Sequence, residues 1–157
     1  ELRIAFDFDS VIADDDSEAI YAENDLISFQ KYETENVEKP HEEGPLHDLF
    51  KKLAFFQKME SKRQKQDESY QRLLRIAIIT ARNAPAHKRV ITSLRKWDIS
   101  PDETFFLGGM DKSLILEIMK PHIYFDDQIL HLSARDKGIP SVHIPFGIRN
   151  FQAEANT

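Results

Sequence analysis

Short apolar runs alternate along the chain with stretches in which apolar residues recur every three or four positions. The runs are typical of buried strands, and the three-to-four spacing is typical of amphipathic helices. Strands are predicted at Leu2–Phe8, Leu73–Thr80, Glu103–Leu107, His122–Phe125 and Pro140–Ile144. Helices are predicted near Glu18–Gln30, Leu46–Met59, Pro85–Trp97, Lys112–Met119 and Leu130–Arg135, with Ser17 as the N-cap of the first. This alternation predicts an α/β fold, with a parallel sheet of about five strands flanked by helices.

The interval between the first two predicted strands is unusually long. Roughly 55–60 residues separate them, whereas a crossover between parallel strands needs only about a dozen. Within it, Ser61–Ser69 contains no apolar residue and is predicted to be a solvated loop or a frayed helix end. We therefore expect a single domain with a core at 1–16 and 71–150, a tail at 151–157, and a helical cap inserted at about 17–70 over the carboxyl edge of the sheet.

Composition narrows the class of protein. The 157 residues are 41% hydrophobic and include 11 Phe, which is typical of one globular domain with a core. The net charge of −6 disfavours nucleic acid as a partner, and no apolar run is long enough to span a membrane. The absence of Cys excludes disulfides and thiol catalysis. No basic-then-apolar leader opens the chain, so we expect a cytoplasmic protein. Because Glu1 stands where Met would, we also expect a fragment of a longer chain; the oligomeric state is not indicated.

Polar residues follow several of the predicted strands at their carboxyl ends. Asp7 and Asp9 come after the first, Thr80 ends the second, and Asp126-Asp127 follows the fourth; Lys112 lies beyond the Gly108-Gly109 turn after the third. Ligand sites of open α/β sheets lie outside the carboxyl ends of the strands. Singly, an Asp pair can be a turn or a helix cap, Thr80 a strand-end hydroxyl and Lys112 a solvated cation. Their common placement favours a site.

These residue types fit phosphoryl transfer. A carboxylate such as Asp7 can attack phosphorus to form an aspartyl-phosphate, and a divalent cation such as Mg²⁺ is then needed to bridge the two anions. Thr80 and nearby backbone N–H groups, such as those of Ala81 and Arg82, can bind phosphoryl oxygens. Lys112 can supply a fixed positive charge, and Asp9 can protonate the leaving oxygen and later deprotonate water.

Four segments resemble the motifs of the haloacid-dehalogenase-like (HAD-like) phosphatases: DFDSV at Asp7–Val11, IITAR at Ile78–Arg82, GGMDK at Gly108–Lys112 and YFDDQ at Tyr124–Gln128. With GPL at Gly44–Leu46, FLGG at Phe106–Gly109 and HIPFGI near the end, the chain more closely resembles the cytosolic type I 5′-nucleotidases, from Leu2 to about Ile148. Residue 10 departs from the pattern, because it is Ser where the wider superfamily favours Gly, and members usually carry a further segment before the first motif.

The resemblance implies a Rossmann-like HAD fold and Mg²⁺-dependent hydrolysis of nucleoside 5′-monophosphates. It implies Asp7 as nucleophile, Asp9 as acid/base with its backbone carbonyl at the metal, and Asp126-Asp127 at the same metal. Thr80 and Lys112 would contact the phosphate.

Further residues are candidates for substrate contacts. Arg82 is a candidate for a second phosphate or ribose contact, and His41 and His47 lie in the predicted cap, where they could face substrate. Phe29 and Tyr32 could stack a base, although core packing is an alternative for both. The acids Asp14–Asp16 are expected to be caps or solvated charges.

Three alternatives to a nucleotidase stay open. A catalytically silent relative would bind a nucleotide or a partner protein, and a phosphatase of the same superfamily would act on another small phosphomonoester. A phospho-accepting signalling domain also combines acids, Thr and Lys on a five-stranded parallel sheet, but there the acid pair comes first. Phosphate release from nucleotides separates the first alternative from a nucleotidase.

Overall fold

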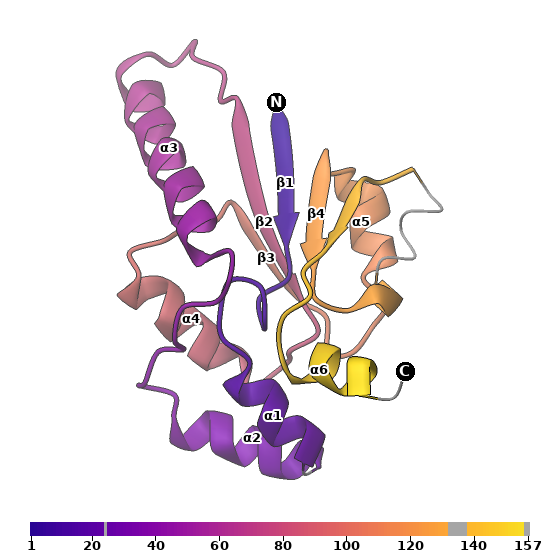
Figure 1. Ribbon diagram of the computed structural model, residues 1–157. Coiled ribbons are helices and arrows are strands. Elements are labelled where there is room, and N and C mark those ends of the chain that lie inside the picture. Colours follow the sequence, from indigo (N-terminus) through magenta and orange to yellow (C-terminus); the bar gives the residue numbers. More distant parts are fainter. Residues whose placement is uncertain (24, 132–137, 156–157) are drawn as a thin grey trace.

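The computed structural model describes residues 1–23, 25–131 and 138–155, and its centre is a five-stranded sheet (Figure 1). All pairings are parallel, and the strand order is β3-β2-β1-β4-β5. The strands are β1 Leu2–Phe6, β2 Leu74–Thr80, β3 Glu103–Phe106, β4 Ile123–Asp126 and β5 Ser141–His143. The predicted α/β class, with a parallel sheet flanked by helices, is confirmed.

Six helices are described, and most lie where the apolar spacing placed them. They are α1 Asp16–Glu23, α2 Leu26–Glu35, α3 His47–Gln66, α4 His87–Lys96, α5 Ser113–Met119 and α6 Ile148–Ala155. The segment predicted to be solvated begins as the last part of α3, which ends at Gln66. Of the helix predicted at Leu130–Arg135, residues 132–137 lie outside the described part of the chain.

The single helix predicted at Glu18–Gln30 is wrong, because two helices occupy this region. Asp25 separates them: its backbone is extended (φ −109°, ψ 175°), and its carboxylate accepts a hydrogen bond from the backbone N–H of Ser28. Asp25 is therefore the N-cap of α2. Ser17, the predicted N-cap, instead lies inside α1, and α4 begins at His87 rather than at Pro85.

Alternation along the strands gives the sheet two apolar faces. Ile4, Phe6, Ile76 and Ile78 share one hydrophobic cluster with residues of α3 and α4. Ala5, Ala77 and Ile79 belong to a second cluster together with Leu116 and Met119 of α5. Successive side chains of a strand point to opposite faces, so near-continuous apolar strands bury both.

The long interval between β1 and β2 divides in space. Figure 1 shows α1 and α2 beyond the carboxyl ends of the strands, whereas α3 runs alongside the sheet, where Phe50 and Ala54 join its core. The chain passes close to the β1–α1 loop on its way to α3: a Cβ on Gly44 would overlap the carbonyl oxygen of Ala13. Of the three helices between β1 and β2, α1 and α2 therefore lie at the edge where the candidate residues are, and α3 does not.

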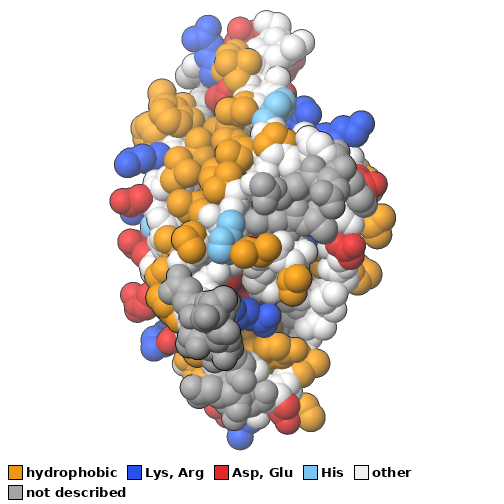
Figure 2. Space-filling view, turned by 45° about the vertical axis from the view of Figure 1, so that its right-hand side comes forward, with side chains coloured by type: hydrophobic (Ala, Val, Ile, Leu, Met, Phe, Trp, Pro, Cys, Tyr) orange, Lys and Arg blue, Asp and Glu red, His pale blue; other side chains and the backbone are white. Residues whose placement is uncertain are grey.

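Some large apolar side chains stay exposed. Phe55, Phe56 and Met59 of α3 are each more than half exposed. On the side of the molecule shown in Figure 2, hydrophobic side chains gather in the upper left, and most Lys, Arg, Asp and Glu side chains lie near the outline of the view. Within the described residues, no helix combines the length and hydropathy that crossing a membrane requires.

Candidate active site

The parallel register brings Asp7 and Asp126 together. Phe6, the last residue of β1, pairs with Phe125 of β4, and the backbone N–H of Asp7 donates to the carbonyl of Phe125 (2.8 Å). Asp7 is 4% exposed and Asp126 is fully buried. Two carboxylates in one buried place repel each other, so their charge must be compensated.

Lys112 supplies that compensation from the N-terminal end of α5. Its Nζ donates to Asp7 Oδ2 at 2.6 Å and to Asp126 Oδ2 at 2.8 Å, and its side chain is only 3% exposed. Burial lowers the pKa of Lys112, but the charges of Asp7 and Asp126 outweigh burial and raise it above its ordinary value. The ammonium is therefore a fixed cation beside both carboxylates.

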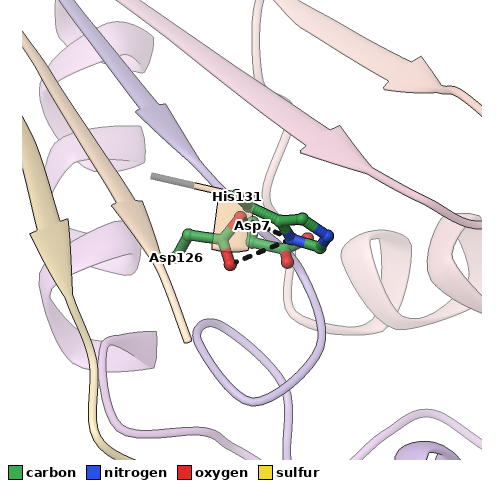
Figure 3. Close-up of side chains that lie close together, drawn as sticks. All are labelled: Asp7, Asp126 and His131. Atoms are coloured by element: carbon green, nitrogen blue, oxygen red, sulfur yellow. Dashed lines mark hydrogen bonds and ion pairs between the residues drawn. The ribbon is translucent and has the colours of Figure 1, made fainter. Parts of the chain in front are cut away.

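Asp126 is held from several sides. The Tyr124 hydroxyl and the Gln128 backbone N–H donate to its carboxylate, and His131 Nδ1 lies 3.2 Å from Oδ2. Burial raises the pKa of Asp126, yet the hydrogen bond from His131 and the charge of Lys112 bring it below the ordinary range. Figure 3 shows Asp7, Asp126 and His131 pointing toward one another; one ligand atom from each lies within 4.8 Å of the others.

Asp127 contrasts with its neighbour. It is 1% exposed, and neither of its carboxylate oxygens has a hydrogen-bond partner among the described residues. Burial, together with the negative charges of Glu18, Asp7 and Asp126, raises its pKa to about 9. A buried carboxylate without a partner is costly, so such a group takes up a proton or binds a cation. Asp7, Asp126 and Asp127 offer carboxylate oxygens, the ligands that a hard divalent cation prefers. The residues present therefore fit Mg²⁺.

A cavity of about 370 Å³ opens beside these carboxylates. Its polar floor includes Asp7, Asp9 and Thr80, and its lining continues over the Gly108-Gly109 turn. Tyr21, Leu26 and Phe29, from α1 and the start of α2, also line it. The cavity thus joins the strand ends to an apolar wall.

Arg82 binds Asp9 at the edge of the cavity. Its Nε donates to Asp9 Oδ2 at 2.8 Å and its Nη2 to Oδ1 at 2.6 Å, while Nη1 donates to Glu33 of α2. Burial lowers the pKa of Arg82, but the charge of Asp9 and its hydrogen bonds raise it above the ordinary value. Because Asp9 and Glu33 engage all three guanidinium nitrogens, Arg82 is bound mainly within the protein.

The loop after β1 turns sharply at Ser10. Its φ of 58° lies in the left-handed region, which favours glycine. This explains the preference for Gly implied by the superfamily resemblance, and it shows that Ser adopts the same kind of backbone here. The Ser10 side chain is buried beside Gly147, where a Cβ would lie 2.6 Å from Ser10 Oγ.

Comparison with known proteins identifies the family. The sequence model of the 5′-nucleotidase family matches residues 1–151. The chain belongs to the 5′-nucleotidase family. It is 37% identical over 138 residues to human cytosolic 5′-nucleotidase 1B, and the match covers 87% of the chain and 22% of that relative. The chain thus spans about a fifth of this relative's length. No solved structure matches it. The family predicted from the motifs is confirmed.

The structure brings most of the residues predicted for this 5′-nucleotidase family site to one edge of the sheet, but not all. Asp7, Asp9, Thr80, Ala81, Arg82 and Phe29 line the cavity, with Lys112, Asp126 and Asp127 buried behind it. His41 does not line it: its side chain is buried, with Nδ1 3.4 Å from Asp14 and Nε2 3.6 Å from Glu33. His47 is likewise buried, against Trp97.

Glu18 and His131 were not singled out from the sequence, yet both line the cavity. Glu18 Oε1 accepts a hydrogen bond from Gln128 and Oε2 lies 3.4 Å from Arg149; burial and the charge of Asp9 raise its pKa to about 7. His131 lies only four residues after the acid pair Asp126-Asp127, but none of the histidines in the sequence shows a zinc-like spacing. Only the fold shows that these side chains belong to the site.

Proposed function

We propose that this chain carries the site of a phosphomonoesterase that hydrolyses nucleoside 5′-monophosphates to nucleoside and phosphate. Membership of the 5′-nucleotidase family supports the substrate class. The observation that carries the proposal is the contact of Lys112 with both Asp7 and Asp126, directly behind the cavity that Asp7 lines. This contact supports Asp7 as a carboxylate nucleophile and Lys112 as the cation that would face an entering phosphate group.

Asp7 is the proposed nucleophile. Its Oδ1 accepts a hydrogen bond from the backbone N–H of Phe8 (2.7 Å), and its Oδ2 accepts from Lys112, so both oxygens are oriented. A lone pair of the carboxylate attacks phosphorus, and the bond from phosphorus to the 5′ oxygen breaks. Thr80, whose hydroxyl oxygen accepts from the backbone N–H of Arg82 (3.3 Å), keeps its own proton to donate to a phosphoryl oxygen.

Asp9 is the proposed acid/base. In its protonated form, Asp9 gives a proton to the departing 5′ oxygen, which leaves as the nucleoside hydroxyl, and Asp9 is left as a carboxylate. Water then attacks the phosphorus of the aspartyl-phosphate, Asp9 takes a proton from that water, and the bond between Asp7 and phosphorus breaks to release phosphate. Lys112 offsets negative charge in both steps.

Asp7, Asp126 and Asp127 would hold Mg²⁺, with the Asp9 carbonyl as the resemblance implies. A bound divalent cation offsets the repulsion between the carboxylates and the phosphate. The unpartnered carboxylate of Asp127 supports this assignment.

The apolar wall of the cavity is the proposed contact for the base. Tyr21 and Phe29 pack edge-to-face with ring centroids 5.7 Å apart, and both line the cavity. We propose α1 and α2 as the cap that carries this wall over the phosphate-binding floor.

Phosphate release tests the proposal. The purified chain is assayed on a panel of nucleoside 5′-monophosphates, nucleoside 3′-monophosphates and sugar phosphates, with Mg²⁺ and with excess chelator. We expect release from 5′-monophosphates only with Mg²⁺. Full activity in chelator contradicts the mechanism, a preference for sugar phosphates contradicts the substrate class, and nucleotide binding without release identifies a silent relative.

A further inference from the structure

A second group of buried charged side chains lies next to the site, where α2 meets the core. Its centre is Glu33 of α2, whose side chain has no exposed surface. Ser17 Oγ donates to Glu33 at 2.6 Å, Arg89 Nη1 donates at 2.8 Å, and Arg82 Nη1 also donates to it. Burial raises the pKa of Glu33, but the contact with His41 and the charge of Arg82 bring it well below the ordinary range. Glu33 is therefore a permanent buried anion.

Arg82 connects this anion to Asp9. One edge of its guanidinium, Nε and Nη2, donates to Asp9, and the remaining nitrogen donates to Glu33. The rings of Phe8 and Phe29 lie 5.7 and 5.4 Å from the guanidinium carbon. A guanidinium is planar and rigid, so the position of the group bound at one nitrogen determines the direction of the opposite edge.

We propose that Glu33 is a positioning residue for proton transfer: it holds Arg82 at the angle at which the guanidinium aligns the Asp9 carboxylate with the leaving oxygen. The inference rests on the proposed function, since it matters only if Asp9 transfers protons. Glu33 belongs to α2, whereas Asp9 and Arg82 follow β1 and β2. The acid/base group is therefore aligned only when α2 is seated over the sheet edge, which couples covering of the cavity to the chemistry.

A simpler role for Glu33 would be to balance the charges of Arg82 and Arg89. The two roles differ in what they predict for Glu33→Asp. This variant keeps the charge but withdraws the carboxylate by one methylene, so charge balance survives and the geometry does not. Glu33→Gln keeps the size and removes the charge. Glu35→Gln on the same helix is the matched control, because Glu35 is exposed and its ion pair with Lys31 spans 3.9 Å.

The test compares two leaving groups. One substrate is a nucleoside 5′-monophosphate, and the other carries sulfur in place of the bridging 5′ oxygen, so that a thiolate leaves and needs less protonation. In Glu33→Asp and Glu33→Gln we expect kcat for the oxygen ester to fall about 10-fold or more, part of the roughly 10²–10⁴-fold that acid–base help contributes. We expect a clearly smaller fall for the sulfur ester, with KM little changed. Glu35→Gln should match the wild type on both.

The possible outcomes test the proposed function and the positioning role separately. A wild-type protein that releases phosphate from neither substrate contradicts the proposed function. If the wild type is active and Glu33→Asp retains the wild-type ratio of the two kcat values, the positioning role is overturned. An equal fold-loss on both substrates is such a result. Thermal melts of each variant establish that it is folded, and if Glu33→Gln does not fold, the ratio in Glu33→Asp decides.

Discussion

Arg82 donates to both carboxylate oxygens of Asp9, over 2.8 and 2.6 Å, although the two residues lie 73 positions apart in the chain. Two-point contact between a guanidinium and a carboxylate fixes orientation as well as distance. The group proposed to transfer protons is therefore oriented by a neighbouring side chain rather than by solvent.

Substitutions of the two acids of the first motif, Asp7 and Asp9, are expected to have different effects on turnover. Asp7→Asn removes the nucleophile, so it should abolish both turnover and the phosphoenzyme that rapid quenching traps. Asp9→Asn removes only acid–base help, so kcat should fall by about 10²–10⁴-fold and slow phosphoenzyme formation should remain. A phosphoenzyme trapped in Asp7→Asn would show that the roles are assigned wrongly. The same conclusion follows if the wild type forms phosphoenzyme and neither variant does.

Lys112→Met should destabilise the fold as well as abolish activity. It leaves Asp7 and Asp126 buried without their shared cation, and removal of one partner of a buried ion pair costs about 3–5 kcal/mol. Urea denaturation measures the free energy of unfolding of each variant. Lys31→Met is the control: Lys31 is exposed, and its removal should change stability by less than about 0.5 kcal/mol. Equal stability of the two variants would contradict a buried Lys112 charge.

Asp127 should make stability depend on pH. Folding raises its pKa from 3.8 to about 9, so the folded state binds the proton more tightly than the unfolded state. The free energy of unfolding therefore falls as the pH rises from the unfolded-state pKa of 3.8 to the folded-state pKa of about 9. Without divalent cations, we expect the melting temperature to fall between about pH 6.5 and 8.5, and Mg²⁺ to restore it most at the upper end.

Asp127→Asn should flatten this pH dependence and weaken the response to Mg²⁺. Asp48→Asn, at an exposed position in the first turn of α3, should leave both as in the wild type. Melting curves across the pH range, with Mg²⁺ and with chelator, provide the measurement. A steep fall that persists in Asp127→Asn would assign the effect to another group.

Phe29→Leu should change selectivity among bases. Phe29 lines the cavity, so loss of its ring should raise KM for some 5′-monophosphates more than for others. His41→Gln should alter stability rather than selectivity, because His41 is buried away from the cavity. Phe55→Leu, at a side chain that is 60% exposed, is the matched control. Identical KM ratios across bases in Phe29→Leu and wild type would remove Phe29 from the base contact.

The sequence determined the class of fold and the floor of the site. Apolar runs alternating with helical spacing predicted the parallel sheet, because period and burial are local properties of the chain. Asp7, Thr80 and Asp126 could be placed at one edge because each ends or follows a strand, and parallel strands end on the same side. The break between α1 and α2 was missed, since one capping Asp interrupted an otherwise continuous helical pattern.

Only the tertiary structure decided which distant charges meet. Glu33 is in sequence one more acid beyond the helix predicted at Glu18–Gln30, and His41 is a residue that could face substrate. Folding buries both, pairs Glu33 with Arg82 and Arg89, and leaves Asp127 without a partner among the described residues. The physical reason is that burial and charge pairing depend on how segments far apart in the chain are packed together, which no local pattern records.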